Sequence, residues 1–175
     1  MRIFLAGGTG VIGRRLVPGL IDAGHELVVL ARNPQRAAAA AELGAEVVQG
    51  DALTAANVRR LVAAAEPELI MHQLTDLSER SSAANAQLRI DGTRNLVQAA
   101  LAADVGAIVL QSIAWVYAPG TGPATEDVAL DLGAADPARP ARRWPTPRMR
   151  ARCASAPTSR ASCTSTTRWR PRSRP

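Results

Sequence analysis

Short apolar runs alternate with longer amphipathic or alanine-rich segments along the first 111 residues. The runs are RIFLA at 2–6, ELVVLA at 26–31, EVVQG at 46–50, LIMH at 69–72 and AIVLQ at 107–111. Their length and continuous apolar character are typical of strands buried on both faces of a parallel sheet. The segments between them predict helices over residues 14–23, 34–43, 55–65 and 83–103. This alternation predicts an α/β fold with a doubly wound parallel sheet.

Residues that typically begin or end helices occur at these predicted boundaries. Gly24 and Gly44 follow the first two predicted helices, Thr54 is placed to cap the third, and Pro67 marks the turn after it. Pro18 is a mismatch, because a proline inside a helix removes a hydrogen bond or kinks the helix.

A glycine-rich run, GGTGVIG at residues 7–13, joins the first strand to the first helix. Gly7 would permit the tight turn, Gly10 would let a pyrophosphate approach the backbone, and Gly13 would let the helix lie close to the strand. The free N–H groups and the positive end of that helix would then face the phosphates. A flexible turn is the alternative, but the position between strand and helix favours a dinucleotide site.

Arg32 follows the second strand, with Asn33 and Arg36 close behind. In NAD sites an acidic residue about 20 residues beyond the glycines holds the ribose hydroxyls. A guanidinium instead suits a 2′-phosphate, which it binds through paired, charge-assisted hydrogen bonds. These residues therefore predict NADP as the cofactor, with NAD as the alternative; a strand-end charge that only faces solvent is the other interpretation of Arg32.

The amino-acid composition of the chain changes abruptly at residue 138. The chain of 175 residues is 47% apolar but only 3% aromatic, so its core must be built from Ala, Val, Leu and Ile. All 21 basic residues are Arg; residues 1–137 hold 10 of them against 15 acidic residues, a net charge of −5. Residues 138–175 hold the other 11 and no acidic residue, so the excess positive charge belongs to this tail. We therefore expect one nucleotide-binding domain over 1–137 and a disordered tail over 138–175.

Two interpretations of the tail remain open. Of its 38 residues, 33 are Arg, Ala, Pro, Ser or Thr, which cannot supply a core strand or an amphipathic helix. A natural basic arm would bind nucleic acid or acidic surfaces without sequence specificity. Out-of-frame translation of a GC-rich gene would give the same residue types, and the sharp break and the absence of Lys and Gly favour it. No specific nucleic-acid partner is expected.

The sequence contains no apolar run near the roughly 20 residues that a membrane-spanning helix requires. The N-terminus also lacks the charged region, apolar core and cleavage site of a signal peptide. Cys153 and Cys163 both lie in the tail and do not indicate a disulfide framework. We therefore expect a cytoplasmic protein without membrane contacts.

Three motifs together resemble the NAD(P)-dependent epimerase/dehydratases, which are extended or atypical short-chain dehydrogenase/reductases. They are the glycine run, the Gly-Asp pair at 50–51 and DGTRNL at 91–96 in the long helix. The resemblance covers about residues 1–137 and implies a Rossmann-like fold, a three-layer α/β/α sandwich whose five parallel strands have the spatial order 3-2-1-4-5. It also implies a further helix, a sixth strand and a substrate-binding lobe, for which residues 138–175 offer no sequence. The chain therefore resembles a truncated member of the family.

The resemblance also implies roles for individual residues. Cofactor contacts would come from Gly7, Gly10, Val11, Ile12 and Gly13 at the pyrophosphate, Asp51 and Leu53 at the adenine, and Gln73, Leu74 and Thr75 at the ribose near the nicotinamide. No cluster with the spacing of metal ligands is present.

Two residues are catalytic candidates by the same resemblance. Ser112 ends the fifth strand where the family places its catalytic Ser or Thr, and Tyr117 lies in SIAWVY, similar to the family's Ser-Ser-x-x-Val-Tyr-Gly. Active members carry a Tyr followed four residues later by Lys, which lowers the Tyr pKa. Thr121 stands at that spacing, and a Tyr with an unperturbed pKa of about 10 is a poor base. The classical catalytic set is therefore absent, and we expect this chain not to turn over substrate.

His25 and His72 are the remaining candidates for general acid–base catalysis. His25 is at a helix-to-strand turn and is expected to be structural; His72 ends the fourth strand at the cofactor edge, where packing is the favoured role.

Two function classes stay open. One is an enzyme whose full-length parent acts as an oxidoreductase or epimerase on a nucleotide sugar or a similar small carbonyl or hydroxyl substrate. The other is a non-catalytic NADP-binding regulatory or sensor module. Because the fifth strand lacks a sequence partner for its outer edge, we also expect a marginal fold, aggregation or a homodimer that covers this edge.

Overall fold

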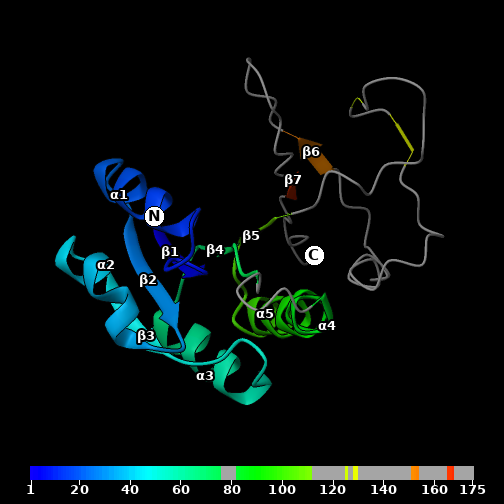
Figure 1. Cartoon of the computed structure of the whole chain (residues 1–175), viewed down its shortest axis with the longest axis horizontal. Helices are drawn as coiled ribbons and strands as arrows, with labels where there is room; N and C mark the ends of the chain where they lie inside the picture. Colours follow the sequence, from blue (N-terminus) through cyan, green and yellow to red (C-terminus); the bar gives the residue numbers. More distant parts are fainter. Residues whose placement is uncertain (76–81, 112–124, 126–127, 130–150, 154–164, 168–175) are drawn as a thin grey trace, which may run out of the picture.

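A computed structural model of the chain describes residues 1–75, 82–111, 125, 128–129, 151–153 and 165–167 (Figure 1). Its centre is a parallel sheet of five strands: β1 (Arg2–Ala6), β2 (Glu26–Ala31), β3 (Glu46–Gln49), β4 (Leu69–His72) and β5 (Ala107–Leu110). The strands are ordered β3-β2-β1-β4-β5, and every neighbouring pair is parallel. The predicted topology is therefore confirmed: β2 and β3 lie on one side of β1, and β4 and β5 lie on its other side.

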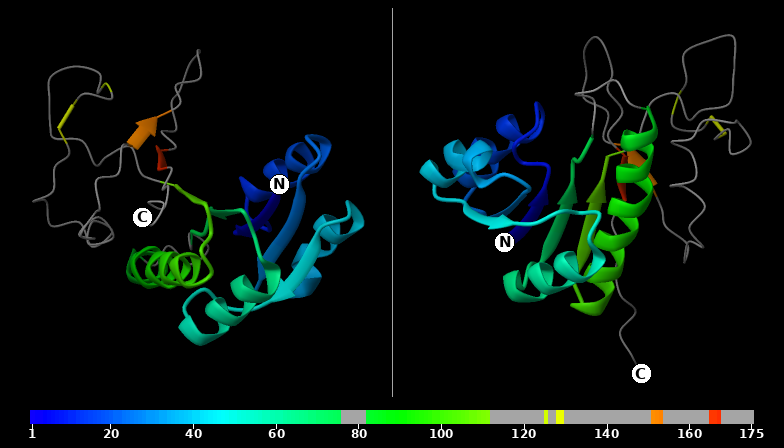
Figure 2. Two further views of the ribbon diagram at one scale, coloured as in Figure 1. Left: turned by 180° about the vertical axis from the view of Figure 1, so that it is seen from behind. Right: turned by 60° about the horizontal axis from the view of Figure 1, so that its bottom comes forward.

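Helices cover both faces of this sheet, in three layers (Figures 1 and 2). Before β4 they are α1 (Gly13–Asp22), η1 (Pro34–Ala37), α2 (Ala38–Glu42) and α3 (Ala55–Ala65). After β4 they are α4 (Ser82–Gln87), the π-helical segment η2 (Leu88–Gly92) and α5 (Thr93–Ala102).

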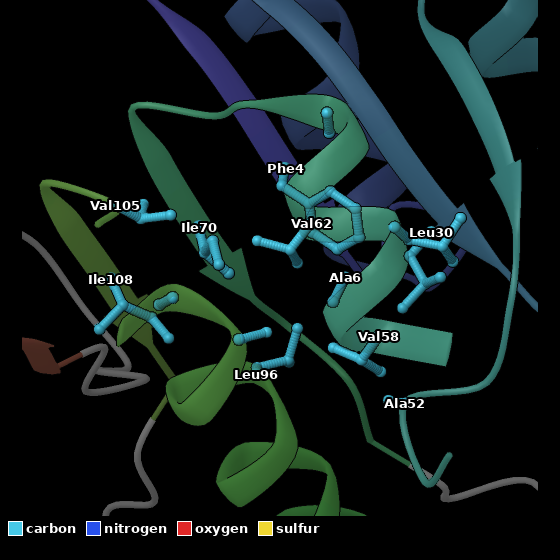
Figure 3. Packing of buried hydrophobic residues seen from close by; sticks show 14 of the residues in the cluster. Phe4, Ala6, Leu30, Ala52, Val58, Val62, Ile70, Leu96, Val105 and Ile108 are labelled. Carbon is cyan, nitrogen blue, oxygen red and sulfur yellow. The ribbon is translucent and has the colours of Figure 1, made fainter. Parts of the chain in front are cut away.

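The two faces of the sheet carry separate hydrophobic clusters, because successive strand residues point to opposite sides. Phe4 and Ala6 of β1 pack with α3 and α5, as Figure 3 shows for Val58, Val62 and Leu96. The alternate residues of β1 belong to the other cluster, which includes residues of α1 and α2. The core is aliphatic apart from Phe4, as the composition predicts.

The helices differ in detail from the prediction. The segment expected as one helix over 34–43 begins as a 3₁₀-helix, and the long helix expected over 83–103 is interrupted by the π-helical segment. Pro18 lies inside α1 without ending it, and Thr54 occupies the N-cap position of α3 without a side-chain capping bond.

Arg2 connects several elements at the amino edge of the sheet. Its Nε donates to the carbonyl oxygen of Ala65 over 2.6 Å, and its terminal nitrogens pair with Glu26 at 3.2 Å and Glu46 at 2.7 Å. Its backbone N–H donates to Oε1 of Glu68. One side chain thus ties β1 to β2, β3 and the end of α3, at the edge opposite to the carboxyl ends of the strands.

Within residues 138–175 the structure describes only β6 (Ala151–Cys153) and β7 (Ser165–Thr167), which pair antiparallel. The rest of that region lies outside the described residues, so its expected disorder and origin stay predictions. β7 lies near β5, the edge strand of the five-stranded sheet (Figure 1). Within the described ranges, none of the helices combines the length and apolar character needed to cross a membrane.

Candidate functional site

A cleft opens at the carboxyl edge of the sheet, where the loops after β1, β2, β3 and β4 converge. It is lined by Gly7, Thr9, Gly10, Leu30, Ala31, Arg32, Gly50, Asp51, Ala52, Gln73, Leu74, Thr75 and Leu88. β1 and β4 are neighbours, and the helices that follow them, α1 and α5, pack on opposite faces of the sheet. The cleft therefore lies at the switch point where doubly wound folds bind their ligands. Of the residues expected at a cofactor, it brings together Gly7, Gly10, Arg32, Asp51, Gln73, Leu74 and Thr75.

Two glycines of the loop are required by close backbone packing. Gly7 has a φ of +103°, and a Cβ added to it would lie 2.6 Å from the backbone carbonyl carbon of Gln73. A Cβ on Gly13 would lie 2.1 Å from the carbonyl oxygen of Gly7. These two positions therefore let the loop lie against the end of β4 and let α1 lie against the loop.

Gly10 differs from both. A Cβ there would meet only the carbonyl oxygen of Gly7, at 3.4 Å, so the space above Gly10 is open toward the cleft. The protein fold does not need a glycine at this position for packing. Its bare backbone leaves room for a ligand.

The start of α1 is left without a side-chain cap. Its N-cap residue is Ile12, which offers no capping group, and the first turn holds no acidic side chain. Val11 and Ile12 are 74% and 41% exposed, and neither they nor Gly13 line the cleft. The N–H groups of Arg14 and Leu16 already donate to the carbonyl oxygens of Gly10 and Ile12, so what the start of α1 offers an anion is the positive end of the helix.

Arg32 and Asn33 have different roles at the end of β2. Arg32 is exposed and lines the cleft. Asn33 lies outside the lining; its Oδ1 accepts a hydrogen bond from the N–H of Gln35 over 2.9 Å and caps η1. Arg36 lies within η1, also outside the lining. Arg32 is thus the one of the three predicted residues that the structure brings to the cleft.

The loop after β3 is held in place by two side chains. Oδ1 of Asp51 accepts from the N–H of Leu53 over 2.9 Å, and the buried Nδ2 of Asn95 donates to the carbonyl oxygen of Ala52 over 2.8 Å. Leu53 is 37% exposed and lies outside the cleft lining. Asn95 had no predicted role, although it belongs to the DGTRNL motif; the structure shows that this residue fastens α5 to the cleft.

Apolar residues that the sequence did not single out complete the lining. Leu30, Ala31, Ala52 and Leu88 add apolar surface to it, and Thr9 and Gly50 the remaining positions. Leu88 comes from η2, and its direction depends on the π-helical geometry, which a pattern of apolar positions does not reveal.

His72 is buried at the end of β4 and lies outside the cleft lining. Its Nδ1 accepts from the N–H of Leu74 over 3.1 Å, so the ring proton is on Nε2, which lies 3.0 Å from the hydroxyl of Thr93. Burial, with a smaller contribution from the Arg89 charge, lowers the pKa of His72 from 6.5 to about 4. These contacts describe a neutral histidine that positions the start of the loop after β4, in agreement with a packing role.

The lowered pKa of His72 predicts a loss of stability in acid. The unfolded chain binds a proton near pH 6.5 and the folded chain only near pH 4, so the free energy of unfolding should fall as the pH drops through this window. The loss should total about 3 kcal/mol between pH 7 and pH 4. Urea unfolding at several pH values would measure it. The variant His72→Gln should have a flatter pH profile than the wild type, whereas His25→Gln serves as the matched control; identical profiles for the wild type and His72→Gln would contradict the assignment.

Ser112 and Tyr117 lie outside the described residues, so their catalytic roles stay predictions. The described part of β5 ends at Leu110, and the N–H of the next residue, Gln111, donates to the carbonyl oxygen of His72 over 3.2 Å. Among the described side chains there is no group of His, Cys, Asp and Glu that could hold a metal ion.

Solved structures with this fold include two UDP-glucose 4-epimerases. The enzyme from Thermus thermophilus, solved with NAD, is 22% identical with a TM-score of 0.67, and the match covers 81% of this chain and 47% of that one. The enzyme from Bifidobacterium longum, solved with NAD⁺ and UDP, is 20% identical with a TM-score of 0.68, over 81% and 45% of the two chains. Identities this low establish the fold alone.

Sequence comparison finds nearer relatives. A Streptomyces protein named 3-diazoavenalumate denitrifying reductase is 42% identical over 144 residues, which are 78% of this chain and 46% of that protein. The photosystem II assembly factor Ycf39 of Synechocystis is 45% identical over 51 residues, 29% of this chain and 16% of the relative. The chain thus spans less than half the length of these curated relatives. Residues 3–138 match the model of the NAD dependent epimerase/dehydratase family, and the chain belongs to that family.

Proposed function

We propose that this chain binds NADP(H) in the cleft at the carboxyl edge of the sheet. The observation that carries the proposal is the presence of Arg32 in the same lining as the open backbone at Gly10. In this arrangement the pyrophosphate lies over Gly10, beside the uncapped start of α1. The adenosine half then extends across β2 toward β3, and its 2′-phosphate lies near the guanidinium of Arg32 rather than near a carboxylate.

The residues of the cleft fit such a cofactor in shape and charge. Leu30, Ala52 and Leu88 offer apolar surface for the adenine, beside the carboxylate of Asp51. One oxygen of that carboxylate is held by the N–H of Leu53, which orients the group and leaves the second oxygen as an acceptor for the adenine amino group. NADPH, when bound, would supply a hydride; the described residues bind and orient it.

The reaction follows the family. We propose that the full-length parent of this chain is an oxidoreductase or epimerase acting on a nucleotide sugar or a similar small carbonyl or hydroxyl compound. The reductase name of the Streptomyces relative supports reduction as the reaction. The alternative is a non-catalytic NADP-binding module, which the lack of a Tyr-x-x-x-Lys pair favours for this polypeptide.

Charge reversal at Arg32 tests the cofactor. In calorimetric or fluorescence titrations the wild type should bind NADPH at least about tenfold more tightly than NADH, which corresponds to about 1.4 kcal/mol. Arg32→Asp should reverse this order, because a carboxylate repels the 2′-phosphate and accepts from the ribose hydroxyls of NADH.

The matched control is Arg59→Asp, the same charge change on the exposed face of α3. It should leave the preference for NADPH unchanged. Equal affinities of the wild type for the two nucleotides would exclude the proposed role of Arg32, and failure to bind either would exclude the cofactor itself.

A further inference from the structure

Asp51 lies in a turn after β3 whose own hydrogen bonds are local. Its Oδ1 accepts from the N–H of Leu53 over 2.9 Å, and its carbonyl oxygen accepts from the N–H of Thr54 over 3.0 Å. Both bonds join residues within the turn, so they fix its shape but not its place in the molecule. The position of the carboxylate in the cleft must therefore be set by the residues on either side of Asp51.

The residues before and after Asp51 are each tied to another element. The N–H of Gly50 donates to the carbonyl oxygen of Ala31 in β2 over 3.1 Å. Beyond Asp51, the carbonyl oxygen of Ala52 accepts from Nδ2 of Asn95 in α5 over 2.8 Å, and both residues are buried. The first tie joins two backbone groups, whereas the second depends on a single side chain.

The surroundings of Ala52 leave its carbonyl oxygen dependent on Asn95. Ala52 belongs to the buried cluster that the sheet forms with α3 and α5 (Figure 3). A Cβ added to Gly92, just before α5, would lie only 3.6 Å from the Cβ of Ala52. Without the Asn95 amide the carbonyl oxygen would be buried without a donor, which is unfavourable. Because Ala52 lines the cleft, the loop could satisfy this oxygen with water by shifting toward the cleft, and Asp51 would move with it.

Such a shift matters because a hydrogen bond weakens steeply outside its preferred distance and direction. In the proposed binding mode the free oxygen of Asp51 accepts from the adenine amino group. Asn95 itself lies outside the cleft lining and acts at a distance. We propose that Asn95 is a positioning residue that makes the site selective for adenine over other bases, by holding Asp51 in place through Ala52; this inference rests on the proposed function.

Deamino-NADP⁺ tests this role, because it differs from NADP⁺ only at the base, where hypoxanthine replaces adenine. A carbonyl oxygen then stands in place of the amino group and cannot donate to Asp51. In calorimetry on the full chain, the wild type should bind NADP⁺ at least about tenfold more tightly, the effect of one hydrogen bond to a charged group. Asn95→Leu keeps the branched shape of the side chain but not its donor, and should reduce this preference to about threefold or less. Asn95→Ser, whose hydroxyl is too short to reach Ala52, should do the same.

Two control variants separate positioning from a general loss of stability. Gln98→Leu changes an exposed residue of the same helix and should leave both the preference for NADP⁺ and the melting temperature as in the wild type. Val105→Ala removes buried apolar atoms just before β5, outside the cleft lining. It should lower the melting temperature, as the loss of the buried Asn95 bond should, and keep the preference for NADP⁺.

The outcomes distinguish this inference from the proposed function. An unchanged preference in both Asn95 variants, whatever their melting temperatures, would assign Asn95 a purely structural role and overturn the inference. Equal affinities of the wild type for the two nucleotides, or a loss of preference in Val105→Ala as large as in Asn95→Leu, would also overturn it and leave NADP(H) binding in place. A wild type that binds neither nucleotide would overturn the proposed function as well.

Discussion

Gly13→Ala should lower the free energy of unfolding by about 3 kcal/mol, the upper range for forcing extra atoms into a packed site. The added Cβ would lie 2.1 Å from the carbonyl oxygen of Gly7 and 2.5 Å from two backbone atoms of Gly8. These are main-chain atoms, so no flexible side chain can move aside. Either α1 must shift away from the loop or the loop must leave the end of β4. Urea denaturation followed by circular dichroism would measure the change.

The same helix provides a control with the opposite sign. Gly19 lies inside α1, and a Cβ added to it would have no heavy atom within 4 Å. Gly19→Ala should therefore raise the free energy of unfolding by about 0.5–1 kcal/mol, because alanine is the better helix former. Equal effects of the two substitutions would show that α1 does not pack on the loop as described.

Gly10→Val should abolish nucleotide binding while the protein stays folded. The first carbon of the new side chain fits, since its only neighbour is the carbonyl oxygen of Gly7 at 3.4 Å. The two methyl groups then occupy the open space above the loop, where the pyrophosphate must approach the backbone. We expect at least a hundredfold loss of NADPH affinity, about 2.7 kcal/mol or more, with an unchanged far-ultraviolet spectrum.

Gly19→Val is the control for this substitution, because it adds the same side chain to an unencumbered face of α1 outside the cleft. It should cost some helix stability and leave NADPH binding intact. If Gly10→Val binds NADPH normally, the phosphates do not lie on the glycine loop, and the proposed placement of the whole cofactor is wrong.

The strands of this fold were predictable because their signal is local and strong. A continuous apolar run such as RIFLA can hardly be anything other than a buried strand when a glycine loop follows it, and its alternate residues supply both cores. The order of the strands followed from the resemblance to a Rossmann-like fold, because the alternation of strands and helices predicts a parallel sheet but not the order of its strands. The α2 region was less well predicted, because its run of alanines has no apolar stripe from which the change from the 3₁₀-helix to the α-helix could be recognised.

The site was predictable where backbone geometry decides it and less so where side chains compete. Gly7 has the positive φ that the expected tight turn requires, and Gly13 is needed for close packing as expected, although α1 packs there on the loop rather than on the strand. Asn33 was expected at the cofactor, but its side-chain oxygen caps η1, a role that the following Pro34 could have signalled. The pairing of Asn95 with Ala52 joins residues 43 positions apart, and no local pattern reports a contact of that separation.

The π-helical segment η2 has a consequence for evolutionary comparison. A π-helical turn closes i→i+5 hydrogen bonds, so it holds about one residue more than an α-helical turn. Each residue of an α-helix turns the chain by about 100°, and an alignment drawn as if the helix from Ser82 to Ala102 were continuous would therefore assign residues on one side of η2 to the wrong face.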